Sequence, residues 1–356
     1  MEEKIPVGIL GATGMVGQNY VKLLQNHPWF KIHFLAASPN SAGMKYSDAA
    51  SGRWQMSDEI PEEVKNIIVE DVSNVAAAVG KCQIVFSAFE TGDKDTVKRL
   101  ENDYAAAGIG VFSNASANRW SEDVPMLIPE INFDHLKMIS NQRKLRGFDR
   151  GFIIVKPNCS LQSYLTPICA LLNAGFEVKK IILTTMQAVS GAGYPGVASL
   201  DVIDNIVPFI SGEEEKTELE PLKILGRNDI QISAHCNRVS VIDGHTACVS
   251  VLFGEKKPKR EEILEIWKNF TSRPQELNLP SAPIQPIIYM EEENRPQPRK
   301  DRNNDKGMAV TVGRLRKCNV FDFKFVGLSH NTVRGAAGGG ILNAELAFKE
   351  GLYGIN

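Results

Sequence analysis

One cysteine lies where a thiol can become a nucleophile. Cys159 follows the apolar run of residues 152–155 and precedes a helix-like stretch, in the sequence Pro157-Asn158-Cys159-Ser160. At a strand-to-helix junction, backbone N–H groups and the positive end of the helix dipole stabilise a thiolate, which raises the fraction of thiol ready to attack at neutral pH. We therefore predict that Cys159 is a catalytic nucleophile. The other five cysteines are expected to be buried, inert thiols.

A histidine and an arginine are the candidate partners of this thiol. Asp243-Gly244 stands between two β-type runs, which predicts a two-residue hairpin. In that register Arg238 and His245 lie on the same face, whereas His235 has the opposite parity. Arg238 would bind a carboxylate and His245 would carry a proton, although a lone strand histidine is more often structural.

A glycine-rich turn opens the chain. The apolar run of residues 7–10 leads into Gly11-Ala12-Thr13-Gly14-Met15-Val16-Gly17, and a helical pattern follows. In a dinucleotide-binding turn, the three glycines permit the tight turn, the approach of a pyrophosphate and close helix–strand packing, and the helix N-terminus donates N–H groups. The expected cofactor contacts are therefore Gly11, Thr13, Gly14, Met15, Val16 and Gly17.

The end of the second predicted strand indicates which dinucleotide binds. Residues 32–37 are followed by Ser38-Pro39-Asn40-Ser41, with no Asp or Glu for the ribose 2′-hydroxyl of NAD. Small hydroxyl groups and N–H groups accept a 2′-phosphate that a carboxylate would repel. We predict NADP, with Ser38 and Ser41 at its phosphate; the alternative is a polar turn with no such role.

The predicted elements that position these residues are alternating strands and helices in the first part of the chain and longer strands in the second. Strand-like runs at 67–69, 84–87, 111–113 and 152–155, with helical patterns between them such as 94–107, predict a doubly wound parallel sheet of the α/β class. Longer β-type runs at 180–188, 230–242, 245–253 and 308–325 predict an α+β domain with a mixed sheet. The expected domains are an NADP-binding domain (1–155), a catalytic and dimerisation domain (156–329) and a glycine-rich helix (330–356) that returns to the first.

Composition excludes several classes of partner. Of 356 residues, 40 are basic and 42 acidic, and the formal charge of -2 gives no electrostatic footprint for nucleic acid. No apolar stretch approaches the roughly 20 residues of a membrane span, and the N-terminus has no leader pattern. The six cysteines form no Cys-x-x-Cys pair, so neither a metal site nor a disulfide framework is expected. We expect a cytoplasmic protein that acts on a small molecule.

Seven blocks of sequence carry a resemblance to a known family. Over essentially its whole length the chain resembles the aspartate-β-semialdehyde dehydrogenase family, in the branch typical of archaea and fungi. Leu161-Gln162 departs from the Thr and small residue of many relatives, which affects packing below the nucleophile. The blocks occupy residues 11–17, 113–117, 157–160, 187–196, 212–216, 295–299 and 329–338.

The resemblance implies a role for each matching residue. Cys159 is the nucleophile, His245 the acid/base and Gln187 a substrate contact, and Asn158 with the N–H of Cys159 is expected to stabilise an acyl oxyanion. The substrate ligands implied are Arg119 for phosphate, Arg238 for the α-carboxylate, and Glu220 and Lys223 for the amino group and phosphate, with Glu213 to Lys216 as competitors. The block near the C-terminus would form the nicotinamide wall, with Ser190, Gly191, Asn331 and Thr332 as contacts.

The reaction implied is NADPH-dependent reduction of L-aspartyl-4-phosphate to L-aspartate 4-semialdehyde through a cysteine thioester, in lysine, threonine and methionine biosynthesis. A homodimer or homotetramer is expected, with residues 291–306 as a candidate interface. Malonyl-CoA reductase is the main alternative, and N-acetyl-glutamyl-phosphate reductase would use the same chemistry. From another class, the chain could be an NADP-binding regulatory protein with a vestigial site.

Overall fold

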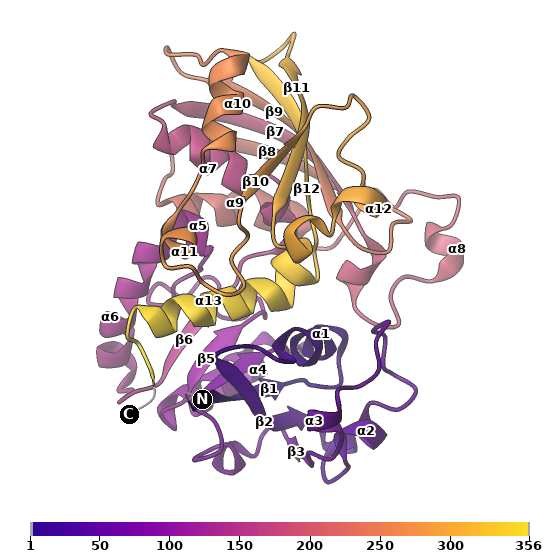
Figure 1. The fold of residues 1–356 in the computed structure, drawn as a ribbon, viewed down its shortest axis with the longest axis vertical. Helices are drawn as coiled ribbons and strands as arrows, with labels where there is room; N and C mark the ends of the chain where they lie inside the picture. The colour runs from indigo at the N-terminus through magenta and orange to yellow at the C-terminus, as the bar shows by residue number, and fades with distance from the viewer. Residues whose placement is uncertain (1–2, 355–356) are drawn as a thin grey trace. The chain divides into compact units, whose positions relative to one another are not determined.

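The chain forms two compact units, and the computed structural model describes residues 3–354 (Figure 1). Unit 1 contains the residues up to Ile128, Phe133–Pro157 and the residues from Ala336 onward, and unit 2 contains Pro129–Asn132 and Asn158–Gly335. The predicted boundaries were 155/156 and 329/330. The difference is greatest at Pro129–Asn132, a four-residue segment that sequence periodicity gave no reason to separate from its neighbours.

Unit 1 is built on a six-stranded parallel sheet with the order β3-β2-β1-β4-β5-β6. This is the strand order of doubly wound dinucleotide-binding domains, in which right-handed crossovers place helices on both faces. Because both faces are covered, β4, β5 and β6 are buried along their whole length. The strands are β1 (Ile5–Leu10), β2 (Phe30–Ala37), β3 (Val69–Asp71), β4 (Ile84–Ser87), β5 (Gly110–Ser113) and β6 (Phe152–Val155).

The last helix of the chain, α13 (Gly338–Lys349), belongs to unit 1 and packs on α1 (Met15–Leu24). A Cβ atom at Gly340 would lie 1.9 Å from the hydroxyl oxygen of Tyr20, so only glycine permits this approach. The buried His27 ring also bonds Glu345 of α13 at 2.8 Å. The other helices of the unit are α2 (Tyr46–Ala49), α3 (Glu62–Lys65), α4 (Lys94–Ala106) and α6 (Met138–Arg146).

Unit 2 is built on a mixed six-stranded sheet with the order β10-β11-β12-β9-β7-β8. β7 pairs with β8 in parallel and with β9 in antiparallel orientation. The two sheets confirm the predicted fold class. The strands are β7 (Val178–Gln187), β8 (Gln231–Arg238), β9 (His245–Phe253), β10 (Ile287–Met290), β11 (Val310–Lys317) and β12 (Phe323–Ser329).

The predicted hairpin at Asp243-Gly244 is wrong. β8 and β9 do not pair with each other, because β7 lies between them. Residues 239–244 therefore cross the end of β7 instead of forming a tight turn. Gly244 has a φ of 103°, so the Asp-Gly step still supplies the backbone conformation that favours glycine.

The helices of unit 2 flank this sheet or lie in its loops. Within residues 3–354, no helix combines the length and the apolar character needed to cross a bilayer. The helices are α5 (Pro129–Asn132), α7 (Leu165–Asn173), α8 (Ser199–Val202), α9 (Glu213–Leu225), α10 (Arg260–Lys268), α11 (Arg273–Glu276) and α12 (Pro298–Asp301).

Candidate active site

The glycine turn of unit 1 has the geometry of a phosphate cradle. Gly11 has a φ of 78°, and a Cβ atom at Gly17 would lie 2.2 Å from the carbonyl oxygen of Gly11. A Cβ atom at Gly14 would contact only that same oxygen, at 3.4 Å, so the outer side of the turn is open. No side chain caps the start of α1 at Met15, which leaves its first N–H groups to an anion. The turn fits a dinucleotide pyrophosphate.

Two buried side chains hold this turn in place. Gln18 donates to the carbonyl oxygens of Thr13 and Arg53, each at 2.8 Å, and Tyr46 donates to Ala12 O at 2.9 Å. Beyond the end of β2, Ser38 precedes a short 3-10 helix, η1 (Pro39–Ser41), and no side chain caps it. No carboxylate follows β2 at that point, as expected for a site that accepts a 2′-phosphate.

Arg119 lies in unit 1, on the loop that follows β5. Its side chain is buried, and it donates to the carbonyl oxygens of Lys156 at 3.0 Å and Asn114 at 3.1 Å. Glu101 fixes the same loop, because its buried carboxylate accepts from Asn118 at 2.7 Å and from Ser87 at 2.9 Å. The guanidinium is therefore held in a fixed position, as an oxyanion ligand requires.

The nucleophile candidate in unit 2 meets its histidine. Cys159 is the first residue of η4 (Cys159–Ser163), a 3-10 turn that precedes α7, and its thiol is partly exposed. His245, the first residue of β9, is fully buried, and its Nε2 lies 3.2 Å from Cys159 Sγ. Burial, followed by the charges of Arg238 and His330, lowers the pKa of His245 to about 3.

Arg238 and His245 come together, although the predicted hairpin does not form. Arg238 pairs with Gln187 across β7 and β8, and Thr246 pairs with Met186 across β7 and β9. Arg238 at the end of β8 and His245 at the start of β9 therefore both lie at the C-terminal end of β7. A Cβ atom added at Gly191 would lie 2.9 Å from Arg238 Nη1 and 3.1 Å from the His245 ring, so Gly191 contacts both residues.

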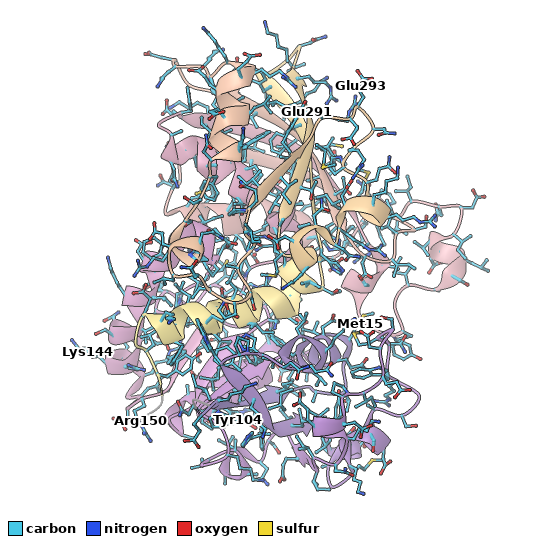
Figure 2. All side chains as sticks on the ribbon, viewed as in Figure 1. Met15, Tyr104, Lys144, Arg150, Glu291 and Glu293 are labelled. Carbon is cyan, nitrogen blue, oxygen red and sulfur yellow. The ribbon has the colours of Figure 1, made fainter. Side chains whose placement is uncertain are left out.

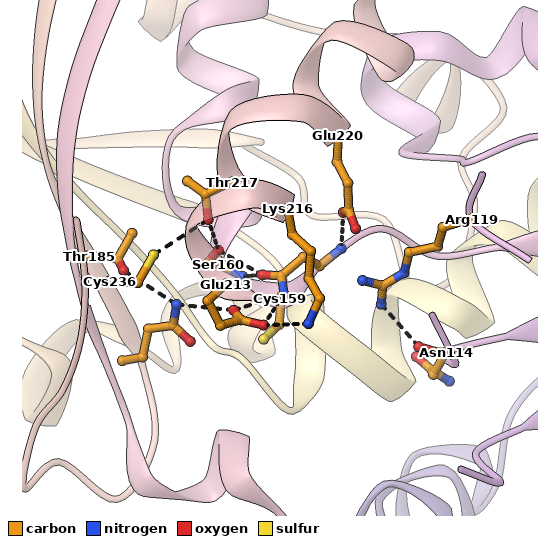
Figure 3. Close-up of polar contacts among 12 residues, drawn as sticks. Asn114, Arg119, Cys159, Ser160, Thr185, Glu213, Lys216, Thr217, Glu220 and Cys236 are labelled. Carbon is orange, nitrogen blue, oxygen red and sulfur yellow. Dashed lines mark hydrogen bonds and ion pairs between the residues drawn. The ribbon is translucent and has the colours of Figure 1, made fainter. Parts of the chain in front are cut away.

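Glu213, at the start of α9, is the centre of a polar cluster beside Cys159 (Figure 3). Its carboxylate accepts from the side chains of Asn158 at 2.8 and 2.9 Å, Gln187 at 3.2 Å and Lys216 at 3.0 Å. Gln187 and Asn158 were singled out from the sequence, whereas Glu213 and Lys216 were only competitors to another pair. The structure brings these four residues together.

Glu220 lies in a different environment from Glu213. It is fully buried, and its carboxylate accepts from the backbone N–H of Asn158 at 2.6 Å (Figure 3). Glu220 has no exposed surface, whereas Glu213 bonds Gln187 and Lys216 beside Cys159. These contacts favour Glu213 and Lys216, and the assignment of either pair to the substrate stays a prediction. Both pairs are Glu-x-x-Lys, and spacing alone could not separate them.

Both ends of the Asn158 amide are hydrogen-bonded within unit 2. Its Nδ2 donates to Glu213, and its Oδ1 accepts from the N–H of Ser160 at 2.8 Å and the hydroxyl of Ser160 at 2.7 Å. Since both ends of the amide are engaged, Asn158 orients the start of η4 and the carboxylate of Glu213. The oxyanion role of Asn158 stays a prediction.

The block near the C-terminus lines the same part of unit 2. Asn331 donates to the hydroxyl of Ser190 at 2.8 Å and accepts from Gly244 N–H at 2.8 Å, and Thr332 lies 3.3 Å from His330 Nδ1. The bonds of Asn331 tie Ser190 to the loop before His245, and Thr332 is held by His330 of its own segment. Gly191 stands against Arg238 and His245.

Gly335 and Arg334 support the nucleophile from behind, and sequence analysis did not assign them a role. A Cβ atom at Gly335 would lie 2.9 Å from the Cβ of Cys159. The buried Arg334 donates to Glu130 at 2.8 Å and to Met308 O at 2.7 Å, within a π-helical turn, η7 (Val333–Ala337). Only the unusual glycine content of this segment signalled close packing.

Among residues 3–354, no cluster of three or more His, Cys, Asp or Glu side chains could hold a metal ion. The chemistry that this arrangement can perform is covalent catalysis by a thiol with a neutral histidine beside it and a carboxylate–amide–ammonium cluster for a polar substrate.

Comparison with known proteins gives consistent matches over both units. One family model, described as "Semialdehyde dehydrogenase, NAD binding domain", matches residues 6–139, and another, "Semialdehyde dehydrogenase, dimerisation domain", matches residues 168–334. Aspartate-semialdehyde dehydrogenases of Schizosaccharomyces pombe and Archaeoglobus fulgidus are 46% and 47% identical, each over 97% of this chain and 98% of the relative.

A solved structure extends the comparison to three dimensions. Aspartate semialdehyde dehydrogenase from Candida albicans, crystallised with NADP, matches with a TM-score of 0.88 and 39% identity, over 99% of this chain and 100% of that chain. A second enzyme of that name from Vibrio cholerae has a TM-score of 0.77 at 22% identity, over 98% and 100%, and shares the fold.

Proposed function

The chain belongs to the aspartate-semialdehyde dehydrogenase family, and we propose that it performs the family's reaction with Cys159 as nucleophile and His245 beside it. The reaction is the NADPH-dependent reduction of L-aspartyl-4-phosphate to L-aspartate 4-semialdehyde and phosphate, a step of amino-acid biosynthesis. The observation that carries the assignment of residues is the 3.2 Å contact between Cys159 Sγ and His245 Nε2.

We propose the following roles for the residues that bind substrate. Arg238 binds the α-carboxylate, for which its planar, doubly donating guanidinium is suited. Glu213 binds the amino group, with Gln187 beside it, because its carboxylate already accepts from the ammonium group of Lys216. Lys216 and Arg119 bind the phosphate, since both are cationic.

The reaction then divides into two half-reactions at Cys159. Its thiolate attacks the acyl carbon, a C–S bond forms, the C–O bond to phosphate breaks, and a thioester remains on the enzyme. NADPH, when bound, supplies the hydride that reduces this thioester. The C–S bond breaks as the semialdehyde leaves, which returns Cys159 to its starting state.

NADP is the cofactor. We propose that its pyrophosphate is held by the turn of residues 11–17 and its 2′-phosphate by Ser38 and Ser41, because the turn is open at Gly14 and no carboxylate follows β2. Ser190, Gly191, Asn331 and Thr332 are proposed on the nicotinamide side. The hydrogen bond between Asn331 and Ser190 and the contact of Thr332 with His330 support a preformed wall.

We propose that the enzyme works as a homodimer or homotetramer in the cytoplasm. Residues 168–334 match a dimerisation domain, which supports self-association. All six cysteines are unpaired thiols, which suits a reducing compartment.

The test is a phosphate-dependent assay. With L-aspartate 4-semialdehyde, NADP and phosphate, purified protein should form NADPH, and Cys159→Ala should reduce the rate by at least about 1,000-fold because the covalent route is lost. Omission of phosphate is the control. Oxidation of NADPH by malonyl-CoA, without activity toward the semialdehyde, would overturn the substrate and keep the thioester mechanism.

A further inference from the structure

The carboxylate of Glu101 joins two strands and a loop of unit 1. Glu101 lies in α4 and is fully buried. Its Oε1 accepts from the hydroxyls of Ser87, at 2.9 Å, and of Ser113, which are the last residues of β4 and β5. Its Oε2 accepts from Asn118 Nδ2 at 2.7 Å. Burial raises the pKa of this carboxyl, and the three donors act in the opposite direction. Donors from three segments therefore meet at one buried group that needs them.

The loop that follows β5 is fixed along its length. The hydroxyl of Ser113 accepts from Ala115 N–H at 3.1 Å while it donates to Glu101. Ala115 and Ala117 form a buried apolar cluster with Val97, which lies four residues before Glu101 on the same face of α4. One face of one helix thus holds the loop through polar and apolar contacts together.

Arg119 follows Asn118 directly, at the end of this loop. Its guanidinium donates to Asn114 O at 3.1 Å, within the loop, and to Lys156 O at 3.0 Å, after β6 (Figure 3). Because these acceptors are backbone oxygens, the position of the guanidinium depends on the position of the loop. A shift of Asn118 would move both the backbone of Arg119 and one of its acceptors.

We propose that Glu101 is a positioning residue that sets the affinity of the site for phosphate, by holding Asn118 and thereby Arg119, without touching the ligand. This inference rests on the proposed role of Arg119 as a phosphate ligand. A guanidinium that is already fixed binds an oxyanion without first losing conformational freedom, so a looser loop lowers the affinity for phosphate.

An exchange of the two groups at the 2.7 Å contact is the direct test. Asn118→Asp places a second carboxylate against Glu101, and like charges repel in a buried site. This variant should raise the KM for phosphate by about 10- to 100-fold. Addition of Glu101→Gln returns one amide and one carboxylate to the contact, and it should bring this KM to within about 3-fold of the wild-type value.

Simple repulsion of phosphate by a new charge would give a different pattern. The double variant keeps its negative charge at position 118, so repulsion would leave it as weak as Asn118→Asp. Glu101→Gln alone removes a charge, and repulsion predicts a lower KM for phosphate. We expect this KM to rise by about 2- to 10-fold, because the charge-assisted bonds from Ser87 and Ser113 are lost. The exposed Asp103→Asn, on the same helix, is the matched control.

The kinetic readout separates positioning from a general loss of stability. The KM values for L-aspartate 4-semialdehyde and NADP should stay within about 3-fold of wild type in each variant, so that only phosphate responds. A KM for phosphate in Asn118→Asp within about 3-fold of wild type would overturn the proposal. So would a double variant that fails to recover.

A measurement without turnover separates this proposal from the proposed function. Thermal unfolding is followed as inorganic phosphate is added, because a ligand of the folded state raises Tm, while the general effect of the salt is common to all variants. Asn118→Asp should need about 10-fold more phosphate than the wild type or the double variant for the same shift. If the wild type shows no turnover and the shifts keep this order, only the proposed function is overturned. Equal shifts in all three proteins would overturn the role of Glu101.

Discussion

Two glutamates on α9 are equivalent in sequence and different in surroundings. Glu213 and Glu220 are each followed three residues later by a lysine, and they are seven residues apart. Seven residues are close to two helical turns, so both glutamates lie near the same face, roughly 10 Å apart along the axis. Their different positions along the helix place Glu213 beside Gln187 and Glu220 at the backbone N–H of Asn158. The spacing of residues in the sequence does not reveal this difference.

Glu213→Gln should therefore raise the KM for L-aspartate 4-semialdehyde by about 10- to 100-fold, because a charge-assisted hydrogen bond to the substrate amino group is lost. Glu220→Gln should leave this KM within about 3-fold and lower the free energy of unfolding by about 1–2 kcal/mol, since the bond to Asn158 N–H is weakened. Steady-state kinetics and urea unfolding measure the two effects. The exposed Glu215→Gln is the matched control, and the opposite pattern would restore Glu220 as the ligand.

At the scale of elements, sequence periodicity located most strands well. The predicted strands 84–87 and 152–155 coincide with β4 and β6, because short, fully apolar runs bounded by turns permit few other boundaries. The Asp243-Gly244 hairpin failed for a topological reason. β7 ends 58 residues before β9 begins, at Gln187 and His245, and it lies between β8 and β9 in the sheet. A local turn signal carries no information about a strand that enters from elsewhere in the chain.

In the glycine turn between β1 and α1, Gly14 and Gly17 are needed for different physical reasons. A methyl group at Gly17 would collide with the backbone of Gly11 and Ala12, whereas one at Gly14 would meet only the carbonyl oxygen of Gly11, at 3.4 Å. Gly17→Ala should lower the free energy of unfolding by about 1–3 kcal/mol. Gly14→Ala should leave stability within about 1 kcal/mol and weaken NADPH binding by at least about 10-fold, because its methyl would occupy the pyrophosphate position.

Thermal unfolding and a fluorescence titration with NADPH separate these two effects. Each variant is the control for the other, because the same atoms are added three residues apart. Wild-type affinity for NADPH in Gly14→Ala would contradict the assignment of the turn as the pyrophosphate site.

At the scale of the whole molecule, one face of the unit 2 sheet is open to solvent in the single chain. Along β7, Leu183 and Thr185 are buried, while Ile182 between β8 and β9 is 47% exposed. An antiparallel or mixed sheet can leave one face uncovered, but apolar side chains there favour a partner. Because residues 168–334 match a dimerisation domain, we expect this face to carry the dimer contact.

The sequence suggested another surface for the contact between protomers, the charged loop at residues 291–306. Figure 2 labels Glu291 and Glu293 at its start, and both are exposed. Ile182→Glu should convert the assembly to smaller species in sedimentation velocity, whereas Arg299→Glu in the loop should not. Val320→Glu, at a position 83% exposed in the turn after β11, is the control for a surface charge. Dissociation by Arg299→Glu alone would move the interface to the loop.

The ends of the long segment of unit 2, residues 158–335, meet, because Gly335 at its last position packs against Cys159 near its first. A segment with adjacent ends can be exchanged between homologous genes as a single cassette. Residues 158–335 would take with them the nucleophile, His245, Arg238 and Glu213, so a chimera should inherit substrate preference from the donor and coenzyme preference from the recipient. Glu130 lies outside the cassette and pairs with Arg334 inside it, so recombination would have to preserve that match across the junction.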